Sequence, residues 1–253
     1  MTETLVAVRH DTGVRTLTLD SPANRNALSA RLLDQLAGAL HDATTDRDVR
    51  VVVLTGSGTV FCSGADLSER GRGAPNRMPE ILTGLVESPV PVIARVNGHA
   101  RAGGLGLIAA ADLAVAPAAA TFAFTEVRVG VAPAMILVPA QRVVEPRFLT
   151  RAVLSGEPFG AADAQSAGLL SAVVEDEDAL DAWVGAQADA VRKGAPGAVA
   201  ATKELLRTLP VQSWADGLAA AAARSAELFA GPEAAEGMAA FLEKRRPSWD
   251  PSS

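Results

Sequence analysis

The sequence is poor in the residues that build metal sites, disulfides and aromatic cores. Its 253 residues include one cysteine, three histidines and no tyrosine, and aromatic residues make up 4%. The single Cys62 excludes an intrachain disulfide and a cysteine-rich metal site, and the histidines show no ligand spacing. We therefore expect no metal centre, and a core built mainly from Ala, Val and Leu.

Excess positive charge and long apolar runs are also missing. The formal net charge of −6 argues against a nucleic-acid-binding protein, because no basic field covers the molecule. No stretch reaches the ~18 uninterrupted apolar residues of a membrane-spanning helix, and residues 1–4 do not begin a signal peptide. The sequence predicts a cytoplasmic protein with no nucleic-acid partner and no membrane span.

Hydrophobic residues make up 49% of the chain, and their pattern is that of an α/β protein. Residues 5–19 predict a hairpin, and leucines at every fourth position from Leu28 to Leu40 predict a helix. The continuous apolar runs 51–54 and 92–96 are typical of strands buried on both faces. Each is followed by a glycine-rich turn, so that strand and turn recur at roughly forty residues, a weak internal repeat.

The pattern becomes helical from Ala161 onward. Pro196 predicts a helix start, and Gly231-Pro232 predicts the end of a second helix that begins near Trp214. A last helix is expected from about residue 233 to 245. We therefore predict a core of residues 1–195 and a C-terminal helical region of residues 196–253.

Two segments that follow strands are candidates for a site. Ser63 and Asp66 have the spacing of a capping box, which predicts a helix start with unpaired amides around Ala65. A capped helix without function is the alternative. In the second segment, Gly103 begins a predicted helix in the same way.

The second segment also matches a dinucleotide-binding fingerprint, with glycines at 104 and 106 and Ala109. The match is weak, because no acidic residue about 20 positions further on is placed to bind a ribose. A nicotinamide-dependent oxidoreductase is therefore a distant alternative.

The residues around both segments resemble a known family. Residues 61–69, Phe-Cys-Ser-Gly-Ala-Asp-Leu-Ser-Glu, resemble the F-C-A-G-A-D-L-x-E signature of the enoyl-CoA hydratase/isomerase (crotonase) family. Residues 97–116 resemble its N-G-x-A-x-G-G-G segment, and residues 240–247 its closing A-F-x-E-K-R-x-P. The resemblance, which includes bacterial methylglutaconyl-CoA-hydratase-like members, implies a spiral of repeated ββα units. It also implies a C-terminal trimerisation region, in a homotrimer or a dimer of trimers. The substrate it implies is an acyl-CoA thioester, with no cofactor besides.

Residue by residue, the resemblance implies that the N–H groups of Ala65 and Gly103 hold the thioester oxygen. It further implies that Glu126 exchanges a proton with the α-carbon, although a solvated loop acid is the alternative. An apolar pocket would raise the pKa of Glu126 and suit it to this task. Further candidates for contacts to CoA are Arg25, Ala27, Asp66, Leu67 and Lys244. For Lys244, a solvated helix end is an equal alternative.

The chain departs from the family at Gly106, where two-glutamate hydratases carry the residue that helps to activate water. Methylglutaconyl-type members resemble this chain there, so an enoyl-CoA hydratase-like lyase is the first hypothesis. A double-bond isomerase that uses Glu126 alone and a non-catalytic acyl-CoA binder are the alternatives. Two segments are expected to shape the acyl pocket: residues 135–137 and the Gly- and Arg-rich residues 69–77, for which a plain surface loop is equally possible.

Overall fold

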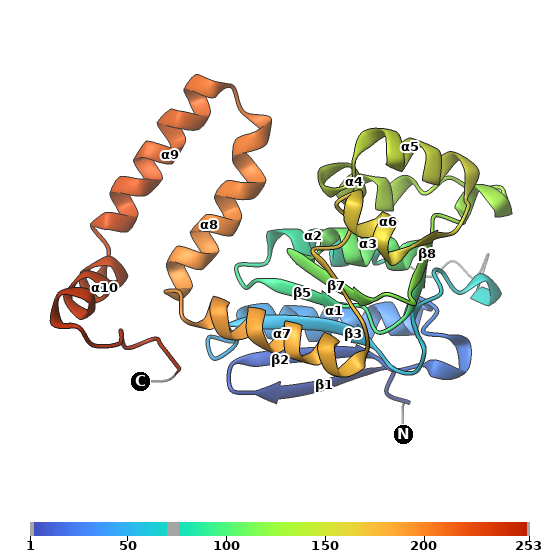
Figure 1. Ribbon diagram of the computed structural model, residues 1–253, viewed down its shortest axis with the longest axis horizontal. Coiled ribbons are helices and arrows are strands. Elements are labelled where there is room, and N and C mark those ends of the chain that lie inside the picture. The colour runs from blue at the N-terminus through green and yellow to red at the C-terminus, as the bar shows by residue number, and fades with distance from the viewer. Residues whose placement is uncertain (1–2, 70–75, 252–253) are drawn as a thin grey trace.

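The computed structural model describes residues 3–69 and 76–251 (Figure 1), so most of the Gly- and Arg-rich segment 69–77 that is expected to shape the acyl pocket lies outside the described residues. The strands are β1 (Val6–Asp11), β2 (Val14–Leu19), β3 (Val51–Gly56), β4 (Val60–Cys62), β5 (Val92–Arg95), β6 (His99–Arg101), β7 (Leu113–Pro117), β8 (Thr121–Ala123), β9 (Phe159–Gly160) and β10 (Ala172–Val174). The helices are α1 (Ala30–Thr45), α2 (Met78–Glu87), α3 (Gly103–Ala110), α4 (Ala134–Val143), α5 (Pro146–Ser155), α6 (Ala161–Ser166), α7 (Glu177–Arg192), α8 (Pro196–Thr208), α9 (Trp214–Phe229) and α10 (Pro232–Glu243). Short 3₁₀ turns are η1 (Pro22–Asn24), η2 (Leu67–Glu69), η3 (Glu126–Val129) and η4 (Leu209–Val211).

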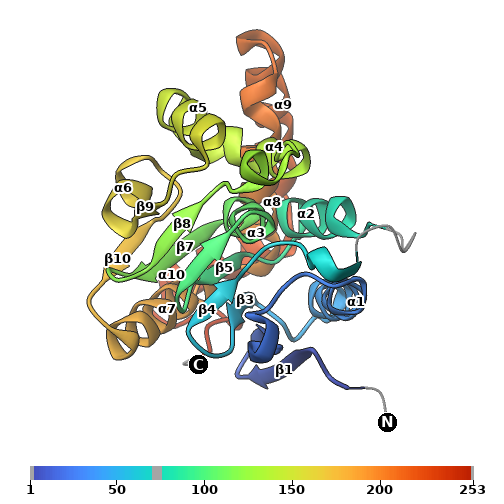
Figure 2. The same ribbon diagram turned by 90° about the vertical axis from the view of Figure 1, so that its right-hand side faces the viewer.

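The strands form two sheets. The larger has the order β1-β2-β3-β5-β7-β10, and all its pairs are parallel except the β1–β2 hairpin. The smaller has the order β4-β6-β8-β9. Successive chain segments place one strand in each sheet and then a helix, as in β3-β4-α2 and β5-β6-α3. This alternation is the predicted spiral of ββα units. Figure 2 shows α4 and α5 above the strands and α7 below them.

The central strands of the larger sheet, β3 and β5, are buried on both faces, which explains their continuous apolar runs. Val52 and Leu54 of β3 pack in the main core with α1 and α2. The alternate residues Val51 and Val53 pack on the other face against Leu180 and other residues of α7. A strand that is covered on both faces has apolar residues at successive positions, without alternating polar ones.

Two local predictions are wrong. Leu28 is not part of α1, which Ser29 caps by accepting from the N–H of Leu32. Leu28 instead pairs with Ala65 in an isolated parallel bridge. The region after residue 161 is not wholly helical, because β10 adds an edge strand to the larger sheet. Three residues beside turns are too short a strand to be distinguished by periodicity.

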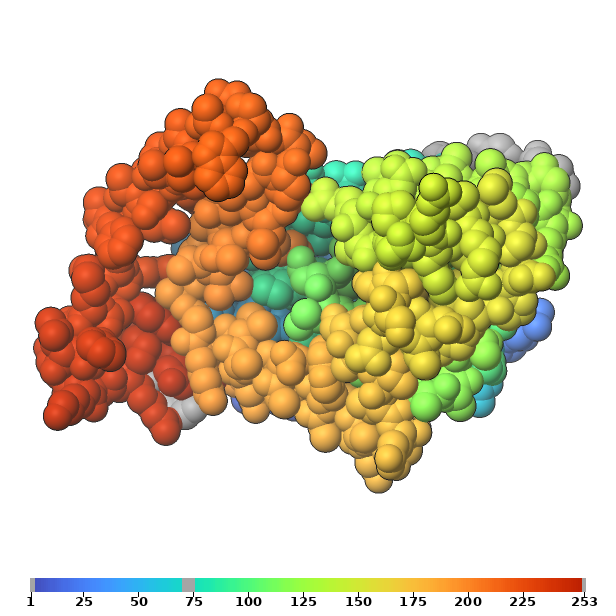
Figure 3. Space-filling model, turned by 45° about the horizontal axis from the view of Figure 1, so that its top comes forward, coloured from blue at the N-terminus to red at the C-terminus, as the bar shows by residue number. Residues whose placement is uncertain are grey.

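The C-terminal helices α8, α9 and α10 extend away from the sheets (Figure 1), and a hollow separates α8 and α9 from α4 and α5 (Figure 3). They expose large apolar side chains, including Trp214 at 87% and Phe241 at 82%. Within the described residues, no helix is long and apolar enough to cross a membrane. Exposed apolar area of this extent is typical of a surface that another protein covers.

Lys203 of α8 joins this region to the core. Its side chain is buried, and its Nζ donates to Asp112 Oδ2 at 2.6 Å and to the carbonyl of Leu85 at 2.9 Å. Asp112 also accepts from the N–H of Val92 and so fixes the backbone at the start of β5. Burial lowers the pKa of Lys203 and raises that of Asp112.

We expect Lys203→Met to lower the free energy of unfolding by about 2 kcal/mol, because Asp112, whose side chain is 31% exposed, would lose its counter-charge and the Leu85 carbonyl would lose a donor. Urea denaturation measures the change. The double variant Lys203→Met/Asp112→Asn should recover part of it, whereas Lys193→Met, at an exposed position of the same charge, should change little. Equal stability of Lys203→Met and the wild type would show that the pair contributes no net stability.

Candidate active site

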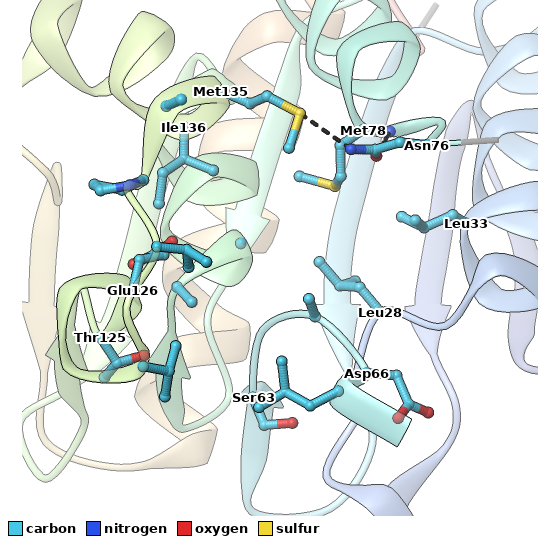
Figure 4. A pocket seen from close by; sticks show the side chains of 18 of the residues that line it. Leu28, Leu33, Ser63, Asp66, Asn76, Met78, Thr125, Glu126, Met135 and Ile136 are labelled. Carbon is cyan, nitrogen blue, oxygen red and sulfur yellow. Dashed lines mark hydrogen bonds between the residues drawn. The ribbon is translucent and has the colours of Figure 1, made fainter. Parts of the chain in front are cut away.

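A cavity of about 540 Å³ lies where the turns after β4, β6 and β8 meet the start of α4. Its lining is mostly apolar, with Leu28, Leu33, Met78 and Ile136 around it (Figure 4). Two of the three residues predicted to shape the acyl pocket, Met135 and Ile136, line it, whereas Leu137 does not. Ala65, Gly103 and Glu126 all line this one cavity.

Ala65 presents its N–H group through a strand-like bridge. The N–H of Leu28 donates to Gly64 O at 2.8 Å, and the N–H of Asp66 donates to Leu28 O at 3.3 Å. In a parallel bridge of this kind, the central residue directs its own N–H and C=O away from the paired strand. No hydrogen-bond partner of the Ala65 N–H occurs among the described residues. Ala65 therefore supplies a free donor to the cavity.

The predicted capping box at this position is wrong, since only the short turn η2 follows. Ser63 Oγ donates instead to the carbonyl of Asn24 at 3.3 Å. Asp66 Oδ1 accepts from the N–H and hydroxyl of Ser68 at 2.9 and 2.7 Å. Asp66 thus forms a local turn, in which the side chain of one residue replaces a helical hydrogen bond.

Gly103 presents its N–H group as the first residue of α3. A first-turn N–H has no acceptor within its own helix, and no other partner occurs for it in the described part of the chain. The preceding residue, Ala102, has φ +47°, which is unusual for a residue with a side chain. Strain of this kind costs about 1–3 kcal/mol and occurs mostly at functional sites.

Gly64 lets the two donor segments approach each other. Its φ is +91°, and a Cβ built on it would lie 2.8 Å from the Cβ of Ala102. A side chain at residue 64 would therefore be strained and would also push against the turn that positions Gly103.

We expect Gly64→Ala to reduce kcat/KM for the chain's acyl-CoA substrate by about 10²–10³, the cost of losing one such donor. Steady-state kinetics measure the loss. Gly160→Ala is the control, because a Cβ there meets nothing within 4 Å and its φ is ordinary. Unchanged kinetics in a folded Gly64→Ala protein would contradict this role of the turn.

The remaining glycines of the second segment serve packing. A Cβ on Gly104 would lie 2.9 Å from Cys62 Cβ, so this glycine lets α3 pack closely on β4. Gly104 and Gly106 are buried inside α3 and do not form a turn before it. The geometry thus gives no support to the dinucleotide fingerprint, in which glycines form that turn.

Glu126 is the third residue after β8 and the first residue of η3. Its Oε2 atom is buried and has no hydrogen-bond partner among the described residues. Burial raises the pKa of Glu126, and only its own backbone N–H opposes this. Figure 4 shows its side chain across the cavity from Leu28 and Ser63. A half-buried carboxylate in apolar surroundings is suited to accept and return a proton.

The space beside Gly106 is filled by an apolar side chain. A Cβ built on Gly106 would lie 2.4 Å from Ile136 Cγ2 and 2.8 Å from Ile136 Cβ. No carboxylate therefore stands where two-glutamate hydratases place their second acid. The pairing of these two residues was not predicted, because nothing in the sequence relates residue 106 to residue 136.

The predicted CoA contacts lie at different distances from the cavity. Asp66 and Leu67 line it, and Leu67 is exposed. Ala27 is buried behind it. Arg25 is exposed, and its carbonyl accepts from the N–H of Ser63. Lys244 is the C-terminal cap of α10 and does not line the cavity. The helix α10 lies at the end of the molecule opposite α4 and α5 (Figure 1).

Two residues beside the donor segments have structural roles. Nδ1 of His99 lies 3.2 Å from the N–H of Thr121 and 2.9 Å from its hydroxyl. Cys62 is fully buried, which raises its pKa to about 12. In residues 3–69 and 76–251, no cluster of His, Cys, Asp and Glu could hold a metal ion.

Comparison with known proteins agrees with this geometry. The model of the enoyl-CoA hydratase/isomerase family matches residues 9–252. The 2,3-dehydroadipyl-CoA hydratase of Escherichia coli is 35% identical over 245 residues, which cover 92% of this chain and 93% of that protein. The mitochondrial enoyl-CoA hydratase domain-containing protein 3 of Danio rerio is 34% identical, over 94% of this chain and 84% of its own.

The solved structures give the same result for the fold. The crystal structure of an enoyl-CoA hydratase from Mycobacterium smegmatis superposes with a TM-score of 0.91 at 36% identity, over 98% of this chain and 99% of that one. The human enoyl-CoA hydratase domain-containing protein 3 superposes with a TM-score of 0.92 at 30% identity, over 97% of this chain and all of that one. The predicted crotonase-like fold is confirmed. This chain belongs to the enoyl-CoA hydratase/isomerase family.

Proposed function

We propose that the protein is an enoyl-CoA hydratase-like lyase that adds water across the 2,3 double bond of an enoyl-CoA thioester. The observation that carries this proposal is the unpartnered Oε2 of Glu126, which lies in the same apolar cavity as two free N–H groups. Relatives whose names are probable enoyl-CoA hydratase and 2,3-dehydroadipyl-CoA hydratase support the reaction class.

In this mechanism, the N–H groups of Ala65 and Gly103 hold the thioester oxygen. Attack at the β-carbon moves the electrons of the double bond towards that oxygen, which becomes an enolate. Two donors fixed before the reaction stabilise the developing charge without reorganisation. Neither donor needs a side chain, which accounts for a site built from alanine and glycine.

Glu126 alone can both accept the proton from water and return it to the α-carbon. Its carboxylate accepts a proton from water as the water oxygen bonds to the β-carbon. The protonated Glu126 then returns this proton to the α-carbon of the enolate, and the carbonyl re-forms. The product has gained one water, and Glu126 ends in its starting form. The raised pKa of Glu126 makes it a better base for water and still allows it to give the proton up.

The test is incubation of the purified protein with a short 2-enoyl-CoA, followed by mass spectrometry. We expect a product that is heavier by one water. In deuterium oxide, the product should carry deuterium at the α-carbon. An unchanged 2-enoyl-CoA at high enzyme concentration would contradict the proposal.

One observation favours double-bond isomerisation as a second candidate. Ile136 covers Gly106, so no second acid holds water near the β-carbon. An isomerase needs only one carboxylate, which removes a proton from the α-carbon of a 3-enoyl-CoA and returns it to the γ-carbon. Incubation with a 3-enoyl-CoA tests this, because isomerisation gives a 2-enoyl-CoA of unchanged mass.

We also propose that the C-terminal helices join copies of the chain into a trimer or a dimer of trimers. The exposed Trp214 and Phe229 of α9 and Phe241 of α10 support this. In such an assembly, Lys244 of one copy could serve the cavity of another. Analytical ultracentrifugation of the wild type and of Trp214→Glu tests it, and a monomeric wild type would contradict it.

A further inference from the structure

A second hollow, of about 250 Å³, lies between α2 and α4 and adjoins the main cavity. We call it the α2–α4 groove. Met135 lines both spaces, and its Sδ accepts from Asn76 Nδ2 at 3.3 Å across the rim of the main cavity (Figure 4). An unbranched methionine can change rotamer at low cost. The Met135 side chain therefore separates the two spaces, and a change of its rotamer would join them.

The groove is apolar along its length and cationic at its far end. Leu82 and Val86 of α2 face Val138 and Pro139 of α4 along its walls. At the ends of both helices lie Glu87 and Arg142. The two charges are not equivalent, because Glu87 pairs with Arg207 of α8 at 3.3 Å. No ion pair or hydrogen bond of the Arg142 side chain occurs among the described residues.

The length of the groove follows from the residues of α4 that line it. Arg142 follows Met135 by seven residues on one helix, which places it about 10 Å further along the axis at the ~1.5 Å rise per residue of an α-helix. An extended hydrocarbon chain, with C–C bonds of about 1.5 Å, covers such a distance with roughly eight carbons.

We propose that the α2–α4 groove binds the distal part of a long acyl group that ends in a carboxylate. The chain would pass Met135, lie between Leu82 and Val138, and place its carboxylate at Arg142. This inference rests on the proposed acyl-CoA site and adds the class of acyl group. The continuity of the two spaces through Met135 supports a ligand that occupies both, and the free charge of Arg142 favours an anionic end.

The test measures binding without turnover, by calorimetry with saturated thioesters that cannot be hydrated. The probes are butyryl-CoA, dodecanoyl-CoA and the CoA monothioester of dodecanedioic acid. We expect dodecanoyl-CoA to bind at least about tenfold more tightly than butyryl-CoA, because several methylene groups leave water. The terminal carboxylate should add about another tenfold. Equal affinity for all three probes would overturn the proposal.

Two variants assign the effects to the groove. Arg142→Met should remove the advantage of the terminal carboxylate and leave dodecanoyl-CoA unaffected, whereas Arg147→Met, the same change at an exposed position of α5, should alter neither. Val138→Trp fills the groove from an exposed position and should remove both advantages while butyryl-CoA binds as before. If Val138→Trp changes the number of subunits but not the preference for long chains, the groove is a contact between copies and the proposal is wrong.

Failure of this proposal and failure of the proposed reaction can be told apart. Hydration of short 2-enoyl-CoA with no preference for longer saturated thioesters would contradict the groove alone. Tight binding of the dicarboxylic probe with no turnover of any enoyl-CoA would contradict the reaction alone.

Discussion

Glu126→Gln is expected to lower kcat for the acyl-CoA reaction by about 10²–10⁴, the range for removal of a general acid–base group. Glutamine keeps the size of the side chain but cannot accept a proton. Because the N–H groups of Ala65 and Gly103 are untouched, affinity for a saturated acyl-CoA should stay within a few fold. Steady-state kinetics and calorimetry measure the two quantities. Glu157→Gln, at an exposed position, is the control and should match the wild type.

The same variant decides whether the protein is an enzyme or only a binder of acyl-CoA. A non-catalytic binder predicts that no turnover exists for Glu126→Gln to remove. If activity is measurable in the wild type and Glu126→Gln retains it in full, the assignment of Glu126 as the acid–base group is wrong. Loss of activity with retained binding excludes the binder.

The pH dependence of the reaction should carry the signature of a buried carboxylate. Burial raises the pKa of Glu126, so kcat/KM should rise with pH through a value above the ordinary range of glutamate. The effect on stability has the opposite sign. Because the folded state disfavours the charged form, stability falls as pH rises from the unfolded pKa through the folded one. Glu126→Gln should therefore equal or exceed the wild type in stability at neutral pH.

Most of the fold could be predicted from the sequence, because the patterns that indicate a strand or a helix start lie within a few neighbouring residues. The apolar runs that became β3 and β5, and the start of α8 at Pro196, depend on hydrophobic pattern and backbone chemistry within a few residues. The donors at Ala65 and Gly103 were reached by resemblance and by the small residues around them. The structure gives the Ala65 donor a different origin, since a bridge to Leu28 orients it and no helix start does.

What could not be predicted depends on contacts between distant segments. Leu28 fits the helical stripe of α1 equally well by spacing, and only the bridge to Ala65 removes it from that helix. Nothing in the sequence around Lys203 indicates that its side chain will be buried against Asp112. Pairings of this kind are set by how helices pack on sheets, which a single sequence does not encode in any local pattern.

The contact between Gly106 and Ile136 is the most informative of these pairings. We expect Gly106→Glu to lower the free energy of unfolding by at least about 3 kcal/mol, because it overpacks a filled site and buries a charge. Ile136→Ala would not relieve it, since the Cβ of residue 136 itself lies 2.8 Å from the new Cβ. Ile136→Gly removes both close contacts. It costs about 1 kcal/mol for glycine in a helix and also removes a buried side chain, whose space the new glutamate fills in the double variant.

The double variant Gly106→Glu/Ile136→Gly should therefore be more stable than Gly106→Glu alone in urea denaturation. It would also place a second carboxylate beside the β-carbon, so its ratio of hydration to isomerisation should exceed that of Ile136→Gly. If Gly106→Glu folds as stably as the wild type, the Ile136 side chain can leave this space freely. In that case the Ile136 side chain would place no constraint on the natural reaction. A stable double variant with an unchanged product ratio would show instead that Glu126 alone determines how water and proton are added.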